Sequence, residues 1–162
     1  MSYLLLKWLH VVGATVLLGT GAGIAFFFWR AHRSGDARLI AGVAADVVRA
    51  DLWFTASAVV LQPVTGYLLM AKGGWSFHLA WIRGSLMLYV LIGCCWLPVV
   101  WLQWRMRDLA RQAVAAQVPL ASSYFGYYRW WFLLGWPAFA GVLAVLWLMI
   151  AKPGELSFIL GR

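Results

Sequence analysis

The sequence predicts an all-α integral membrane protein: a four-helix bundle formed by a single transmembrane domain over residues 1–162. The composition is the first observation, because 64% of the residues are hydrophobic and only 11% are charged. A soluble domain carries about 25% charged residues. The second observation is a set of four apolar runs, each about as long as a helix that crosses a bilayer. Helices are preferred because every backbone polar group needs an internal partner in lipid.

The first span is expected over residues 3–28, YLLLKWLHVVGATVLLGTGAGIAFFF. No basic segment precedes it and no small-residue cleavage site follows, so we interpret it as a permanent helix and not as a signal peptide. Small residues recur along it, and they would let another helix or a flat cofactor approach closely. These residues are Gly13, Ala14, Gly19, Thr20, Gly21 and Gly23.

The second span is expected over residues 52–70. Apolar residues return at helical spacing from Ala37, which predicts a helix that begins near the surface, with Ser34 or Asp36 as its N-cap, and that can run directly into this span. The pair Gln62-Pro63 lies deep in the span. Proline frees a backbone carbonyl group and bends the helix, so this helix should face the interior of the bundle.

The third and fourth spans are expected over residues 77–104 and 130–151. A helical extension should follow the third span as far as Val118, because Pro119 cannot continue it. Glycine and proline recur in the fourth span, at Gly135, Pro137 and Gly141.

The distribution of basic residues predicts the topology. The first and third loops carry most of them, and the positive-inside rule places such loops in the cytoplasm. Both termini are therefore expected on the periplasmic side. The basic residues of these two loops are Arg30, Arg33, Arg38, Arg49, Arg105, Arg107, Arg111 and Arg129, and those of the opposite side are Lys7, Lys72, Arg83, Lys152 and Arg162.

The net charge of +8 does not indicate nucleic-acid binding, because the arginines stand at the ends of apolar runs, where they meet lipid headgroups. The five acidic residues are too few to suggest a carboxylate enzyme site, and none is expected in the middle of the membrane. This argues against an ion-coupled transporter. Cys94 and Cys95 are adjacent, so they point in different directions on a helix and predict buried thiols.

Two histidines on the predicted outer side suggest a haem b site. His10 lies about two turns inside the first span and His78 lies at the start of the third. Imidazole is an axial ligand of haem iron. Lys7, one turn above His10, and Arg83 could pair with the two propionates. An ionisable side chain within a membrane span is a functional-site hypothesis by default.

Each of these residues also has a structural interpretation. The His10 ring could hold the first helix to the second, with Gln62 or Thr65 as its partner. His78 could be an interfacial histidine in contact with water. Lys7 and Arg83 could extend to the membrane surface. His32, in the first cytoplasmic loop, is expected to be solvated.

Four segments resemble the bacterial membrane family called domain of unknown function 2269. They are LKWLHVVGATVLLGTGAG, LQPVTGYLLM, WIRGSLMLYVLIG and YYRWWFLLGWPAFAGVLAVLWLMIAKP. The resemblance covers nearly the whole chain and implies a multi-pass protein of the bacterial inner membrane.

The Lys-x-x-His opening of the first span also distantly resembles the HemJ-type protoporphyrinogen oxidases and the CopD-like membrane proteins. The HemJ resemblance implies that His10 is a haem b ligand. That family has a functional lysine early in a later helix, and the matching position here is Ser85, a departure that speaks against protoporphyrinogen oxidation. The CopD resemblance leaves copper as an alternative, although the chain lacks the Met and His clusters of soft copper sites.

The expected function is therefore haem b binding with electron transfer or oxidation of a small molecule, which would make the protein a haem-dependent oxidoreductase. The alternatives are a non-enzymatic assembly factor or accessory subunit with a structural His10, and a copper-handling protein. The lipid bilayer is the expected surrounding, nucleic acid is not expected, and a quinone or other redox partner and a homo-oligomer remain open.

Overall fold

The structure, a computed structural model, describes residues 1–153, so Arg162, which belongs to the predicted topology, lies outside the described residues. The described residues form helices and no strand. In order they are α1 (Tyr3–Ser34), α2 (Ala37–Ala50), the π-helix η1 (Asp51–Thr55), α3 (Ala56–Gly73), α4 (Ala80–Ala116) and α5 (Ser122–Ala151). Within residues 1–153, four helices are long and apolar enough to cross a membrane. The predicted all-α membrane bundle is confirmed.

The turn between α1 and α2 is built by local hydrogen bonds. Gly35 ends α1 with a φ of 69°, a left-handed conformation that glycine adopts without steric cost. The Asp36 side chain then accepts a hydrogen bond from the Arg38 backbone N–H at 2.8 Å. Of the two predicted N-caps for this helix, Asp36 is the one observed.

The second spanning helix is one continuous helix from Ala37 to Gly73, in which α2, η1 and α3 follow one another without a break. It starts well before the predicted span of residues 52–70. No proline precedes Pro63 in this stretch, and one face remains apolar through Ile40, Ala44 and Val47, so the helix continues through its exposed charged residues.

The remaining long helices also extend past the predicted spans. α4 ends at Ala116, where Gln117 adopts a left-handed conformation with a φ of 55°, just before Pro119. The predicted helical extension toward Val118 is therefore observed. α5 begins at Ser122, eight residues before the predicted fourth span. The end of α4 and the start of α5 therefore continue beyond the apolar residues of their spans.

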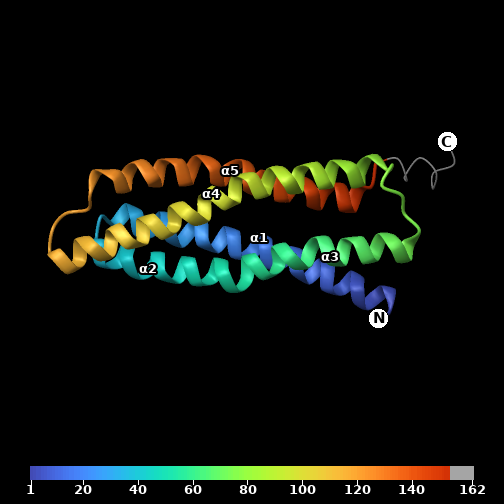
Figure 1. Ribbon diagram of the computed structural model, residues 1–162, viewed down its shortest axis with the longest axis horizontal. Helices are drawn as coiled ribbons and strands as arrows, with labels where there is room; N and C mark the ends of the chain where they lie inside the picture. Colours follow the sequence, from blue (N-terminus) through green and yellow to red (C-terminus); the bar gives the residue numbers. More distant parts are fainter. Residues whose placement is uncertain (154–162) are drawn as a thin grey trace.

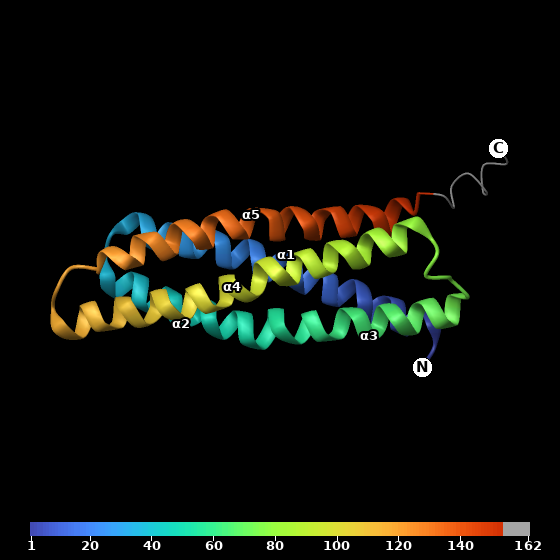
Figure 2. The ribbon, with the colours of Figure 1, turned by 45° about the horizontal axis from the view of Figure 1, so that its top comes forward.

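The helices lie side by side in an elongated bundle (Figure 1). α1 packs along α3, α4 packs along α5, and α2 packs on α4 and α1. The same neighbours are seen in the turned view of Figure 2. The start of α1 and the end of α5 lie at the same end of the bundle, as an even number of spans requires.

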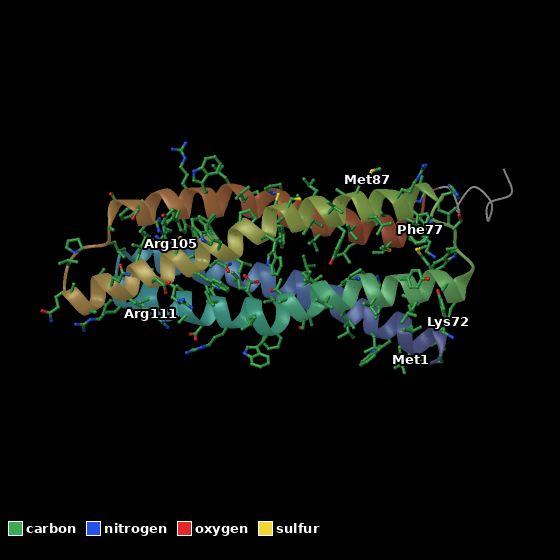
Figure 3. All side chains as sticks on the ribbon, viewed as in Figure 1. Met1, Lys72, Phe77, Met87, Arg105 and Arg111 are labelled. Carbon is green, nitrogen blue, oxygen red and sulfur yellow. The ribbon has the colours of Figure 1, made fainter. Side chains whose placement is uncertain are left out.

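The main hydrophobic core occupies the half of the bundle that contains α2. Phe28 and Met106 are fully buried there. The rest of this core comes from four helices and comprises Ile24, Ala31, Ile40, Ala44, Val47, Val99, Leu102, Ala110, Tyr124 and Trp131. Many apolar side chains elsewhere point outward, such as Met87, which is 72% exposed (Figure 3). Lipid would cover these outward faces in a membrane.

An aromatic cluster joins the helices at the opposite end. The Trp75 ring, in the turn after α3, lies 6.4 Å from the Tyr3 ring and 5.5 Å from the Trp81 ring, measured between centroids. The Lys152 Nζ atom lies 4.0 Å from the Trp75 centroid, a cation–π contact. Trp75 thus connects the start of α1, the start of α4 and the end of α5.

Candidate functional site

His10 lies on the face of α1 that packs against α3, and it is half-buried. Its ring Nδ1 atom lies 2.7 Å from the Thr65 Oγ1 atom. The Thr65 hydroxyl group also lies within hydrogen-bond distance of two backbone carbonyl oxygens, Leu61 at 2.7 Å and Gln62 at 3.2 Å. When its single proton is directed to one of these carbonyls, Thr65 accepts from His10 and the ring carries its proton on Nδ1.

This tautomer leaves the Nε2 atom of the neutral ring with a free lone pair. Nε2 has no hydrogen-bond partner among residues 1–153. Metal-bound histidines show the same arrangement, in which one ring nitrogen donates to the protein and the other binds the metal. The predicted partner Thr65 is therefore observed, and the ring is oriented with one nitrogen available.

The backbone of α1 is held to α3 at the same level. The Gln62 side chain donates a hydrogen bond from Nε2 to the His10 carbonyl oxygen at 2.9 Å. Gly13, one turn further along α1, makes this possible, because a Cβ atom there would collide with the Gln62 amide. Gly66 lies against the ring, and a Cβ on it would be 3.4 Å from the His10 Cε1 atom. Small residues thus allow α1, Gln62 and the imidazole to pack closely.

The small residues further along α1 differ from Gly13. A Cβ atom added at Gly19, Gly21 or Gly23 would meet no atom within 4 Å. The close approach that the sequence predicts for the whole stripe therefore occurs, in the described residues, at Gly13.

The other predicted site residues lie at the same end of the bundle and are exposed. Lys7 shares the helix face of His10 one turn nearer the start of α1. His78 belongs to the turn before α4, where its backbone N–H donates to the Ser76 Oγ atom at 3.2 Å. Arg83 lies in the first turn of α4 and is exposed. Within the described residues the structure records no contact between His78 and His10.

The expectation that His32 is solvated is wrong. His32 lies in the last turn of α1, and its ring stacks on Tyr128 with 3.4 Å between centroids and 6° between planes. Its Nδ1 atom is 3.3 Å from the Tyr124 hydroxyl group. α1 continues past the predicted span, so this histidine packs against α5 instead of lying in a loop.

Sequence reasoning missed a second polar site, because Asp51 was expected at the edge of a span. Asp51 instead lies inside the candidate span Ala37–Gly73, in η1, and is 5% exposed. The Thr55, Gln103 and Trp96 side chains face its carboxyl group. A sequence signal existed: Asp51 and Thr55 continue, at helical spacing, the buried face of α2 that includes Val47.

In the part of the chain that the structure describes, no group of side chains is placed to bind a metal ion through several protein ligands. Among residues 1–153, no group of three or more His, Cys, Asp or Glu side chains could hold a metal ion. A haem requires only one or two protein ligands, so this observation bears on a copper site and not on a haem.

The sequence matches the model of a family described as predicted integral membrane protein (DUF2269) over residues 4–153. The chain belongs to this family. The match includes His10, the α1–α3 contact and the Asp51 cluster. No curated protein and no solved structure matches the chain.

Proposed function

We propose that the protein is a haem b-binding membrane protein that transfers electrons or oxidises a small molecule. The observation that carries this proposal is the hydrogen bond between His10 Nδ1 and Thr65 Oγ1. With the ring proton on Nδ1, the Nε2 atom would be available to bind the haem iron, as in other metal-bound histidines. The free Nε2 fits the chemistry of haem ligation, and a bound haem would supply one-electron chemistry.

The chain's own residues would orient and hold the group. Thr65 holds the His10 ring plane against α3, and Gln62 anchors the backbone of the same residue. Lys7 is exposed on the same face of α1 nearer the membrane surface, so its ammonium group is available to pair with a propionate. Arg83 and His78 are exposed at the same end of the bundle and supply a second cation and a second imidazole.

A specific observation favours a second candidate, a non-enzymatic accessory or assembly subunit. Both hydrogen bonds at His10 connect α1 with α3, one through the ring and one through the backbone carbonyl. In this function His10 is a structural residue that holds two helices together. Copper handling has less support, because the described residues offer no cluster of three metal-ligating side chains.

The absorption spectrum of the protein purified in detergent from haem-supplied cells tests the proposal. The wild-type protein should be coloured, with a Soret band that shifts on reduction, and His10→Ala should lose this band while keeping its helical circular dichroism. Arg33→Ala is the matched control, because Arg33 is exposed at the opposite end of α1. It should retain the band fully.

Two outcomes would contradict haem binding. One is a wild-type protein that stays colourless when haem is added. The other is a His10→Ala protein with an unchanged Soret band. A colourless wild type whose stability falls with His10→Ala would support the structural candidate instead.

A further inference from the structure

A buried polar cluster lies between η1 and α4, and none of the residues proposed for haem binding belongs to it. Asp51 and Thr55 come from η1, and Trp96 and Gln103 come from α4. Asp51 is 5% exposed, Thr55 7% and Gln103 1%. An acidic side chain is thus enclosed by protein inside a candidate membrane span.

Four polar atoms of this cluster are buried and have no hydrogen-bond partner. They are Asp51 Oδ2, Thr55 Oγ1, Trp96 Nε1 and Gln103 Oε1. The side chains face one another, and no hydrogen bond is made among these four atoms. Buried polar groups are almost always paired, so several unpaired atoms in one place require an explanation, such as a bound water, ion or proton. Two of them, Asp51 Oδ2 and Gln103 Oε1, are pure acceptors when the acid is ionised, and they require a donor or a cation.

In the described residues, no basic side chain is among the groups that face Asp51, and Arg105, two residues beyond Gln103 on α4, is exposed. On α2, Arg49 pairs with Asp46 at 3.0 Å, and both side chains are exposed. On α4, Arg107 pairs with Asp108 at 2.8 Å. An ionised Asp51 would therefore be a buried charge without a counter-ion, which is costly in a medium of low dielectric constant.

The other helices packed against η1 contribute no charge either. α1 has no charged residue from Val11 to Trp29, and α3 has none from Ala56 to Ala71. Cys95 is buried next to Trp96 on α4, but the groups that face the carboxyl group are Thr55, Gln103 and Trp96.

We propose that Asp51 is a proton-binding site, a carboxyl group that carries a proton at neutral pH and donates it to the Gln103 Oε1 atom. A single proton removes the unpaired charge and satisfies both acceptors at once. The indole N–H group of Trp96 also faces the carboxyl group. A proton needs no coordination shell, whereas a hard metal cation takes about six or more oxygen ligands, and the side chains of Asp51, Thr55 and Gln103 offer four.

The local backbone agrees with a functional role. η1 is a π-helical turn, in which the Ala56 N–H donates to the Asp51 carbonyl oxygen, five residues back. Single π-helical turns inside α-helices occur frequently at functional sites. Acidic residues inside membrane spans are rare, and proton relays are among the functions that they mark. The site is independent of the proposed haem function, because it uses none of the same residues.

Infrared spectroscopy of the full-length protein in lipid tests this inference. The aspartates are labelled with ¹³C, which separates them from Glu155. The wild-type protein at neutral pH should show the carbonyl stretch of a protonated carboxylic acid, shifted by the label. Asp51→Asn should lose this band, and Asp46→Asn, an exposed acid on the same helix, should keep it. Gln103→Met should move the band to higher frequency, because the acid loses its acceptor.

Three results would overturn the proposal. The first is the absence of a protonated-acid band in the wild-type protein at neutral pH. The second is a band that persists in Asp51→Asn. The third is a band that disappears when sodium chloride replaces choline chloride, which would assign the site to Na⁺. The wild-type measurements do not depend on any variant, so the test holds even if Asp51→Asn fails to fold.

Discussion

The hydroxyl group of Tyr89 on α4 donates a hydrogen bond of 2.6 Å to the backbone carbonyl oxygen of Val59 on α3. Val59 lies four residues before Pro63, and proline has no N–H to offer to that carbonyl group. Tyr89 therefore supplies the donor that the helix lacks. It also links α3 to α4, two helices that otherwise make few contacts.

Tyr89→Phe should destabilise the bundle, because the Val59 carbonyl is left without a partner, at a cost of about 1–3 kcal/mol. Thermal unfolding in detergent, followed by circular dichroism, measures this. Tyr67→Phe, an exposed tyrosine on α3, is the control and should change little. Pro63→Ala restores the missing N–H, so the double variant should be less destabilised than the two single effects combined. Additive effects would contradict the assigned role of Tyr89.

Gly13→Ala should displace the Gln62 amide and break its hydrogen bond to the His10 carbonyl oxygen, because the new Cβ would collide with that amide. Overpacking of this kind costs about 1–3 kcal/mol. Gly21→Ala, where a Cβ meets nothing within 4 Å, should be neutral or stabilising. The same thermal unfolding assay compares the two. Equal effects at both positions would mean that the close contact between Gly13 and Gln62 does not contribute to stability.

Thr65→Val removes the acceptor of the His10 Nδ1–H group and keeps the side-chain volume. The expected loss of stability is about 1 kcal/mol, and haem retention should fall by about ten-fold or more, since outer-shell partners support ligands to this extent. Thr15→Val is the matched control, because Thr15 donates to the Val11 carbonyl on the exposed side of α1. Haem titration of both variants gives the comparison.

His78→Ala tests the second axial position. If His78 coordinates the haem with His10, the variant should change from a six-coordinate, low-spin spectrum to a five-coordinate one. Lys7→Ala should weaken haem retention without abolishing it, because the lysine would pair with a propionate and not with iron. Visible absorption and resonance Raman spectra of the purified proteins report both effects. An unchanged spectrum in His78→Ala would remove His78 from the site.

The topology prediction places both termini in the periplasm. Figure 3 shows Met1 and Lys72 at one end of the bundle and Arg105 and Arg111 at the other. In a background with both native cysteines replaced by alanine, Ser2→Cys should react with an impermeant maleimide on intact cells. Arg111→Cys should react only after lysis. The opposite pattern would reverse the orientation.

Composition and periodicity were sufficient to predict the helical bundle. An apolar run long enough to cross a membrane pairs its own backbone polar groups when it forms a helix. The sequence also located local chemistry: the Asp36 cap, the carbonyl group freed by Pro63, and α3 as the partner of His10. The sequence did not identify Tyr89 as the donor to Val59, because that contact depends on how α3 and α4 lie in space. Likewise, Gln62 binds the His10 backbone and not its ring.

The errors have a common physical origin in the ends of the spans. Hydrophobicity marks where a helix is apolar, and not where it begins. α1 therefore extends past its apolar run and carries His32 into contact with Tyr128. In the same way, the second spanning helix starts at Ala37, which places Asp51 inside the bundle. His32 could not be assigned correctly before the end of α1 was known, whereas the helical spacing of Val47, Asp51 and Thr55 already indicated a buried Asp51.

The π-helical turn at Asp51–Thr55 also sets the rotational phase of the helix that contains it. One residue more or fewer rotates everything beyond it by about 100°. α2 presents its apolar face to α4, and α3 presents Thr65 and Gln62 to α1; the turn brings both faces into place on one rod. A single-residue deletion here would leave the hydropathy profile unchanged and still misalign the His10 contact. The number of residues in this helix is therefore itself constrained by the packing of its two faces.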